Sequence, residues 1–322
     1  MKLFKFLPLG LVATIPAASF AGPAINGAGA TFPAPLYQRW FQDYAAATGE
    51  RVNYQSVGSG AGIRQFVAGT VDFAASDEPI TAKEAAKVKR GFVQIPATGG
   101  TIAIAYNKPG CKLKLTQKQT VDIFSGRITD YKQVGCSAGK MTVIHRSDGS
   151  GTTYAFTNSL DAFGGWKPGV GKSVNWPTGV GAKGNEGVSG TIKNTPGGIG
   201  YVNTGFVRPN KLQAAVLQNK AGNFVGPSAV TGAAALNGIT LDPVTLAGEN
   251  PNPSAAKAYP ISTLTWILAY KTGNGAKTEA IRDAINYALS GKAQLIADDL
   301  GYVPLAGSVL HRARLKVNQI GK

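Results

Sequence analysis

The chain has 322 residues, 43% of them hydrophobic, and its 33 lysines and arginines exceed its 17 acidic residues to give a formal charge of +16. This length is enough to bury a large core and usually divides into two domains, while the charge favours anionic partners without distinguishing nucleic acid, an acidic surface or a small anion. No membrane-spanning segment is expected after the first residues, because no apolar run there approaches the roughly 20 residues needed to cross a bilayer.

The first residues have the pattern of a cleavable secretory signal. Two lysines precede an apolar stretch over residues 6–15, and the small-x-small tripeptide Ser19-Phe20-Ala21 follows it. We therefore predict a signal peptide over residues 1–21, and a mature chain that begins near Gly22 with a net charge of +14, since both lysines are removed. An uncleaved membrane anchor is the alternative.

Signals for strands, turns and helices alternate in the first part of the mature chain. Apolar residues at four-residue spacing from Leu36 predict a helix that Gly49 ends, and a strand over 52–57 follows. A short helix closed by Gly69 then leads to a strand over 71–75. This alternation indicates an α/β domain with a largely parallel sheet.

The second part of the chain continues the alternation with longer loops. Capping boxes at Thr81 with Glu84 and at Thr116 with Gln119 predict two helix starts. The region 164–205 is rich in glycine, proline and asparagine and should form loops between short elements. Further elements are expected as strands at 101–106, 141–145, 199–202 and 264–270 and as a helix at 276–290.

Cys111 and Cys136 are the only cysteines of the chain. Because an exported protein meets an oxidising compartment, one disulfide that closes this segment is the simplest interpretation. Two free buried thiols are the alternative, because the sequence does not reveal the distance between them. Neither case is catalytic, since the spacing matches no redox or metal-binding motif.

Three turns that lead into predicted helices are rich in hydrogen-bond donors. They are GAGATFP at 27–33, GSGAG at 58–62 and RSDGSGTT at 146–153, and the last adds an arginine to the hydroxyls and amides of a helix start. Each turn alone is also explained as an ordinary glycine-rich turn with a serine or threonine cap. In an open α/β sheet, however, loops at the carboxyl ends of strands converge on one crevice, so together the three turns could surround one oxyanion.

Asp77 follows the predicted strand over 71–75 and would share that crevice. A phosphate near neutral pH carries a proton, because its second pKa lies at about 6 to 7, and Asp77 could accept a hydrogen bond from it. Sulfate has no such proton, so the same carboxylate would repel it. The alternative role for Asp77 is a helix or turn cap beside Pro79.

Two segments resemble nucleotide-binding motifs but do not meet their requirements. The segment 165–173 misses the phosphate-loop spacing by one residue, since Trp166 stands where the first glycine is required. Gly179, Gly181 and Gly184 fit G-x-G-x-x-G but follow no clear strand, so dinucleotide binding is not expected and a flexible loop accounts for them.

No metal or cofactor is expected. His145 and His311 are the only histidines, and without a Cys/His cluster zinc lacks ligands, so His145 is interpreted as a strand residue next to the site. No G-x-S-x-G elbow is present, which weakens a serine hydrolase, although Ser150 remains a candidate nucleophile.

At these same segments the sequence resembles the periplasmic phosphate-binding proteins of the high-affinity phosphate ABC transporters. Two departures are mild: Ala61 stands where a glycine is common, and residues 94–97 match more loosely. The matching motifs cover most of the mature chain and lie at 27–35, 57–60, 71–77, 146–152, 175–177 and 184–185.

The resemblance implies an α/β, two-lobed periplasmic binding protein fold (type II), with lobes joined by a hinge of crossing strands and phosphate enclosed between them. Lobe I would comprise residues 22–98 and 263–322 and lobe II residues 99–262, with crossings near Thr98 and Ser262. Asp148 would orient Arg146 without contacting the phosphate itself. The implied phosphate ligands are Thr31, the amide of Phe32, Ser59, Asp77, Arg146, Ser150, Gly151 and Thr152.

We therefore expect high-affinity binding of inorganic phosphate in the periplasm and its delivery to the membrane permease of an ABC transporter, without chemical turnover. The protein is expected to be a monomer that uses no cofactor and binds no nucleic acid. Two alternatives stay open at this point: a periplasmic phosphatase that uses Ser150 or a metal, and a basic adhesion or nucleic-acid-binding protein, suggested by the +14 charge.

Overall fold

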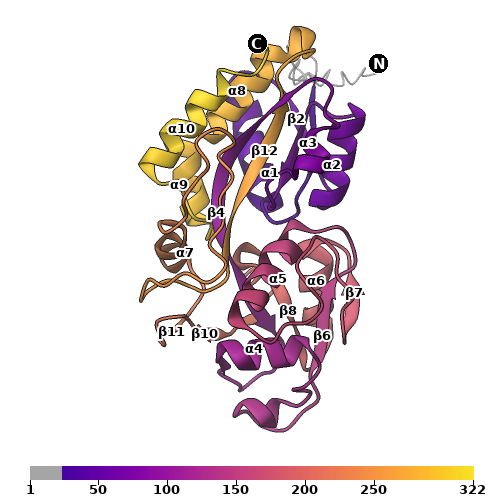
Figure 1. Cartoon of the computed structure of the whole chain (residues 1–322), viewed down its shortest axis with the longest axis vertical. Coiled ribbons are helices and arrows are strands. Elements are labelled where there is room, and N and C mark those ends of the chain that lie inside the picture. Colours follow the sequence, from indigo (N-terminus) through magenta and orange to yellow (C-terminus); the bar gives the residue numbers. More distant parts are fainter. Residues whose placement is uncertain (1–23) are drawn as a thin grey trace, which may run out of the picture.

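The computed structural model of the protein describes residues 24–322. The predicted signal peptide, residues 1–21, and the predicted mature start at Gly22 lie outside the described residues. Figure 1 shows an elongated α/β molecule in which two groups of elements lie one above the other, joined by the long strands β4 (Phe92–Tyr106) and β12 (Ser262–Tyr270). None of the helices in residues 24–322 has the length and apolar character required to cross a membrane.

The strands form one mixed sheet in the order β2-β1-β3-β12-β4-β8-β6-β7, with β9 also paired to β4, and a small sheet in the order β11-β10-β5. Their bounds are β1 Ile25–Gly29, β2 Val52–Ser56, β3 Phe73–Ser76, β5 Lys114–Leu115, β6 Thr142–Arg146, β7 Val180–Ala182, β8 Gly198–Asn203, β9 Gln213–Ala214, β10 Val216–Gln218 and β11 Phe224–Val225.

The helices begin and end largely where the local signals place them. Gly49 and Gly69 adopt the left-handed conformation that ends α1 and α2, and both predicted capping boxes are formed, at the starts of α3 and α4. The bounds are α1 Ala34–Thr48, α2 Ser59–Ala68, α3 Ala82–Ala85, α4 Gln117–Phe124, α5 Gly151–Phe163, α6 Gly184–Asn194, α7 Ala229–Leu236, α8 Thr278–Ala288, α9 Gly291–Asp299 and α10 Gly307–Val317.

The sheet divides into two halves that define two lobes. The first lobe contains the parallel strands β1, β2 and β3 with α1, α2 and α8 to α10, and the second contains the parallel strands β6, β7 and β8 with α4 to α6. Strand β4 pairs with β12 over Phe92 to Thr101 and then with β8 from Ile102 onward. Both of these pairings are antiparallel, as is the pairing of β12 with β3, so the sheet is mixed around the strands that pass between the lobes.

The first lobe is completed by the C-terminal helices. Helix α1 buries Leu36, Trp40 and Tyr44, the predicted apolar stripe, and the Trp40 indole donates a 2.7 Å hydrogen bond to the carbonyl of Ala293 in α9. Helix α8 buries the predicted stripe around Ile281 on the same core. Burial of these large side chains ties the two ends of the described chain into one hydrophobic core.

Two predictions about the middle of the chain were wrong. The region 164–205 contains loops between short elements as expected, but a flexible loop does not account for the G-x-G-x-x-G glycines, because Gly181 lies in β7 and Gly184 begins α6 with φ 71°. The glycines within α6 hid the helix, since glycine is a poor helix former. Strand β4 begins at Phe92, well before residue 101, and a bulge opposite Thr265 and Trp266 accommodates Pro96.

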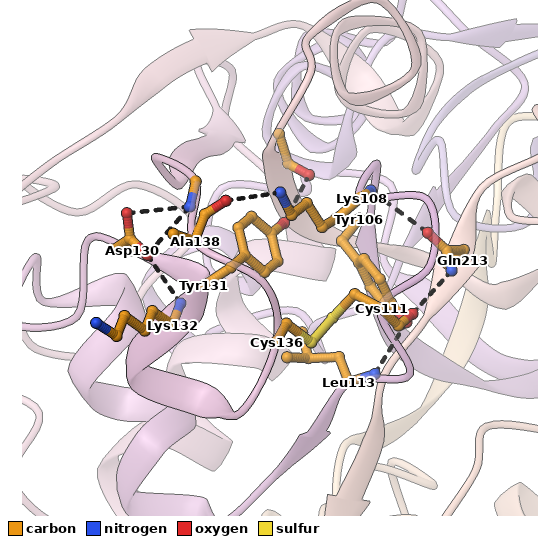
Figure 2. The surroundings of a disulfide bond; sticks show 12 residues. Tyr106, Lys108, Cys111, Leu113, Asp130, Tyr131, Lys132, Cys136, Ala138 and Gln213 are labelled. Carbon is orange, nitrogen blue, oxygen red and sulfur yellow. Dashed lines mark hydrogen bonds between the residues drawn. A yellow bond between two sulfur atoms is a disulfide. The ribbon is translucent and has the colours of Figure 1, made fainter.

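The two cysteines form the predicted disulfide, which excludes the alternative of two free thiols. Figure 2 shows that the loop around Cys111 is held by further hydrogen bonds. The Tyr106 hydroxyl and the Gln213 amide each donate to the Cys111 carbonyl at 2.9 Å, and the Leu113 N–H donates to the Tyr106 oxygen at 3.1 Å. The disulfide therefore fastens an already ordered loop of the second lobe to the segment around Cys136.

Candidate functional site

The predicted site residues come from the carboxyl ends of strands in both lobes and meet where the lobes face each other. In the first lobe Thr31 follows β1, Ser59 begins α2 after β2, and Asp77 follows β3. In the second lobe Arg146 ends β6 and Ser150 is the N-cap of α5. We call the full set the donor cluster, and all its members are buried: Thr31, Phe32, Ser59, Asp77, Arg146, Ser150, Gly151 and Thr152.

Asp77 is the acid of the donor cluster, and the residue is 1% exposed. It accepts a 2.8 Å hydrogen bond from the Thr265 hydroxyl of the first lobe and a 3.2 Å bond from the Thr152 hydroxyl of the second. Burial raises the pKa of Asp77 from 3.8 to about 7, although the Thr265 hydrogen bond and the charge of Arg146 oppose that rise. Its side chain is therefore able to exchange a proton near neutral pH.

Arg146 supplies a buried positive charge whose orientation is fixed by Asp148. The guanidinium donates two hydrogen bonds to the Asp148 carboxylate, from Nε at 2.7 Å and from Nη2 at 2.5 Å. Asp148 also accepts a 3.0 Å bond from the Gly184 N–H. Burial disfavours the charged form of Asp148, but the Arg146 hydrogen bonds and charge outweigh it, so the pKa of Asp148 is lowered. The remaining Nη1 lies 3.4 Å from the Thr152 hydroxyl.

Several backbone N–H groups of the donor cluster lack a protein acceptor. Within residues 24–322, no hydrogen-bond acceptor is found for the N–H groups of Phe32, Ser59, Gly151 or Thr152. Buried amides are nearly always paired, so four unpaired ones from the two lobes mark a place for an acceptor from outside the chain. Those of Ser59, Gly151 and Thr152 also lie at helix N-termini, where the helix dipole favours negative charge.

Asn185 and Thr265 belong to the same arrangement, and the sequence reasoning gave neither a role. The Asn185 backbone N–H and side-chain amide donate to the Thr31 hydroxyl oxygen at 3.0 and 2.8 Å, and the side-chain amide also donates to Thr152 at 3.1 Å. Because its oxygen accepts from two N–H groups, the Thr31 hydroxyl is left to act as a donor. The Gly184-Asn185 motif was the available signal for Asn185, whereas Thr265 lies in a strand with no motif.

Glycines allow the two lobes to approach closely at this place. The Gly60 N–H donates a 2.9 Å hydrogen bond to the Gly149 carbonyl across the lobes. A Cβ atom at Gly151 would stand only 2.6 Å from the Ser59 hydroxyl and 2.7 Å from the Asp77 nitrogen. The glycines of these turns are therefore required by interlobe packing as well as by turn geometry.

Ser150, the candidate nucleophile of the hydrolase alternative, and His145, the predicted strand residue next to the site, both have structural contacts. The Ser150 oxygen accepts a 2.9 Å hydrogen bond from the Thr153 N–H and caps α5. The imidazole of His145 stacks on Trp176, with ring centroids 4.9 Å apart, and burial lowers its pKa. Among the described residues, no group of three or more His, Cys, Asp or Glu side chains is arranged to hold a metal ion.

The sequence of the chain is similar to a family model and to named proteins. A family model described as a PBP superfamily domain matches residues 15–292, a range that includes every residue of the donor cluster. A relative named phosphate-binding protein PstS from Haemophilus influenzae is 39% identical over 327 residues, which covers 96% of this chain and 95% of that protein. A second PstS protein, from Xylella fastidiosa, is 40% identical over 299 residues, covering 87% of this chain and 81% of that protein.

The fold is also shared with solved structures. A phosphate binding protein from Stenotrophomonas maltophilia superposes with a TM-score of 0.72 at 22% identity, and the match covers 91% of this chain and 94% of that one. At this level of identity the match shows the two-lobed architecture and leaves the ligand to be argued from the site itself.

Proposed function

Because this chain belongs to the PstS family of phosphate-binding proteins within the PBP superfamily, we propose that it binds inorganic phosphate in the periplasm and delivers it to the membrane permease of an ABC-type phosphate transporter. It is a binding protein and not an enzyme, as its relatives are phosphate-binding transport proteins. The phosphate is captured and released without any covalent bond being made or broken.

The donor cluster is the proposed phosphate site. Its hydroxyls, the Arg146 guanidinium and the amides without a protein acceptor would surround the tetrahedral anion. The observation that supports this assignment is the set of unpaired N–H groups contributed by both lobes, since an anion held between the lobes would satisfy them together. Asp148 would act on the ligand indirectly, by fixing the guanidinium plane of Arg146.

Asp77 would select phosphate over sulfate. As a carboxylate it accepts the hydrogen bond of a protonated phosphate oxygen, whereas sulfate offers no proton and would be repelled. Thr265 and Thr152 hold the two Asp77 oxygens in place on either side.

We propose lobe I as residues 22–98 and 263–322 and lobe II as residues 99–262, which is supported by the change of β4 partner between Thr101 and Ile102. Residues 1–21 would be removed as a signal peptide after export, and the mature protein would act as a monomer that docks transiently on the permease.

Calorimetric titration of protein freed of bound phosphate tests this function. One phosphate per chain should bind at about pH 8, where sulfate should give no heat at comparable concentration. An Arg146→Ala variant should lose at least about a hundredfold in phosphate affinity, because the anion loses its only charged donor in the cluster. Comparable affinity for phosphate and sulfate in the unmodified protein would disprove the role given to Asp77.

A further inference from the structure

A charged interlobe contact lies beside the donor cluster and is made by one cation and two carboxylates. Lys172 stands in the loop between α5 and β7 of the second lobe. Its ammonium contacts the Glu78 carboxylate at 2.5 Å and the Glu84 carboxylate at 3.1 Å, and both acids belong to the first lobe. A single side chain therefore bridges the two lobes by electrostatic attraction.

The bridge is shielded from water more than an ordinary surface ion pair. The side chains of Lys172, Glu78 and Glu84 are 18%, 10% and 25% exposed. Fully exposed pairs contribute little because water and salt screen them, and partial burial reduces that screening. The Glu84 carboxylate is held in place within the first lobe, since it accepts hydrogen bonds from the Thr81 N–H at 3.0 Å and the Thr81 hydroxyl at 2.8 Å.

Both ends of the bridge are connected directly to the donor cluster. Glu78 is the chain neighbour of Asp77, and its N–H is held by the Ser76 hydroxyl at 3.2 Å. On the other side, the Lys172 carbonyl accepts a 2.9 Å hydrogen bond from the N–H of Ser150. Opening the lobes far enough to free a ligand at the donor cluster would therefore also pull Lys172 away from its two acids.

We propose that Lys172, with Glu78 and Glu84, forms a latch that holds the lobes closed and sets the rate at which bound phosphate is released. This inference rests on the proposed function of the donor cluster. The latch acts through the closed arrangement of the lobes, so Lys172 is a positioning residue. Removing it should speed release while leaving the initial capture of phosphate almost unchanged, because the latch forms only when the lobes close.

The test is the release rate of radiolabelled phosphate from the loaded protein, chased with excess unlabelled phosphate. Lys172→Met should release phosphate roughly three- to tenfold faster than the unmodified protein, with an association rate within about twofold. Lys172→Arg, which keeps the cation, should retain slow release. Lys193→Gln is the matched control, because Lys193 is an exposed lysine of the same lobe and its loss changes the net charge equally.

A double-variant cycle shows whether Lys172 acts through Glu78. Glu78→Gln should also speed release, and the variant carrying both Glu78→Gln and Lys172→Met should release phosphate no faster than Lys172→Met alone. The latch is refuted if Lys172→Met releases at the normal rate, if Lys193→Gln has the same effect, or if the two effects multiply. Failure of the unmodified protein to bind phosphate at all would instead refute the proposed function.

Discussion

The Asp77 carboxylate is contacted by a threonine hydroxyl on each of its oxygens, and these two threonines come from different lobes. In Asp77→Asn one oxygen becomes an amide that donates hydrogen bonds and carries no charge. We expect phosphate affinity to fall by about 10- to 100-fold, because a charged acceptor is lost, and sulfate binding to become measurable. Titration of both anions into this variant measures the change in their affinity ratio. Asp161→Asn, at an exposed acid of α5, is the control, and an unchanged ratio in Asp77→Asn would contradict the prediction.

The pKa of Asp77 gives a separate prediction about stability without phosphate. Because the folded state raises this pKa to about 7 from 3.8, it holds the proton more tightly than the unfolded state does. The resulting stabilisation is fully present below about pH 4 and is lost as the pH rises through about 7, a change of a few kcal/mol.

Urea unfolding of the phosphate-free protein and of Asp77→Asn across this pH range measures that change. Asparagine stays neutral at every pH, so the variant lacks the contribution and serves as the reference. The free energy of unfolding of the unmodified protein relative to the variant should fall between about pH 4 and pH 8. If this difference in the free energy of unfolding stays constant or rises with pH, burial does not raise the pKa of Asp77 in the phosphate-free protein.

At the scale of secondary structure elements, the N-terminus of α5 must pass very close to the first lobe. Gly151→Ala places a methyl group 2.6 Å from the Ser59 hydroxyl and 2.8 Å from the Asp77 Cβ, so the lobes cannot close as described. Phosphate affinity should fall at least about 30-fold, while the helix itself gains slightly from alanine. Gly190→Ala in α6 is the matched control, since a Cβ there meets no atom within 4 Å. Equal phosphate affinities for the two variants would show that the close approach is unimportant.

The Cys111–Cys136 disulfide joins two loops of the second lobe, and the two cysteines are 25 positions apart in the sequence. Replacing both cysteines by serine should lower the free energy of unfolding by about 3 kcal/mol, because the unfolded chain becomes less constrained. Phosphate affinity should remain within about twofold, since the loop is held by its own hydrogen bonds (Figure 2). Urea unfolding with and without reductant measures the stability. A large loss of phosphate affinity would show that this loop contributes to phosphate binding.

Elements with a strong local signal could be predicted from the sequence, and those stabilised mainly by tertiary contacts could not. The capping boxes and the glycines that end α1 and α2 act within a few residues, so their positions were clear. Helix α6 contains glycines that disfavour helix, and it is held instead by packing on β6 and β8. For the site, turns with motifs were found, whereas Thr265 reaches Asp77 only because β12 pairs with β3.

At the scale of the whole molecule, the chain passes between the lobes along β4 and returns along β12, and the C-terminal helices complete the first lobe (Figure 1). Half of the donor cluster therefore belongs to each lobe, and neither lobe alone has both the arginine and the acid. The Lys172 bridge is divided in the same way, because Lys172 belongs to the second lobe and Glu78 and Glu84 to the first. Under the proposed function, binding and closure would be one event, because the ligand and the latch would both join the same two lobes.

Hydrogen exchange can detect this closure directly. The N–H of Gly60 bonds to the Gly149 carbonyl at 2.9 Å and that of Asn185 to the Thr31 hydroxyl at 3.0 Å, and both bonds cross from one lobe to the other. These two amides should exchange at least about tenfold more slowly with phosphate than without it, because exchange needs the lobes to part and bound phosphate opposes that opening. Amides within β1 should exchange slowly in both conditions, and added sulfate should protect neither Gly60 nor Asn185. Equal protection of Gly60 with and without phosphate would show that the lobes stay together in the absence of ligand, and phosphate release would then need another route.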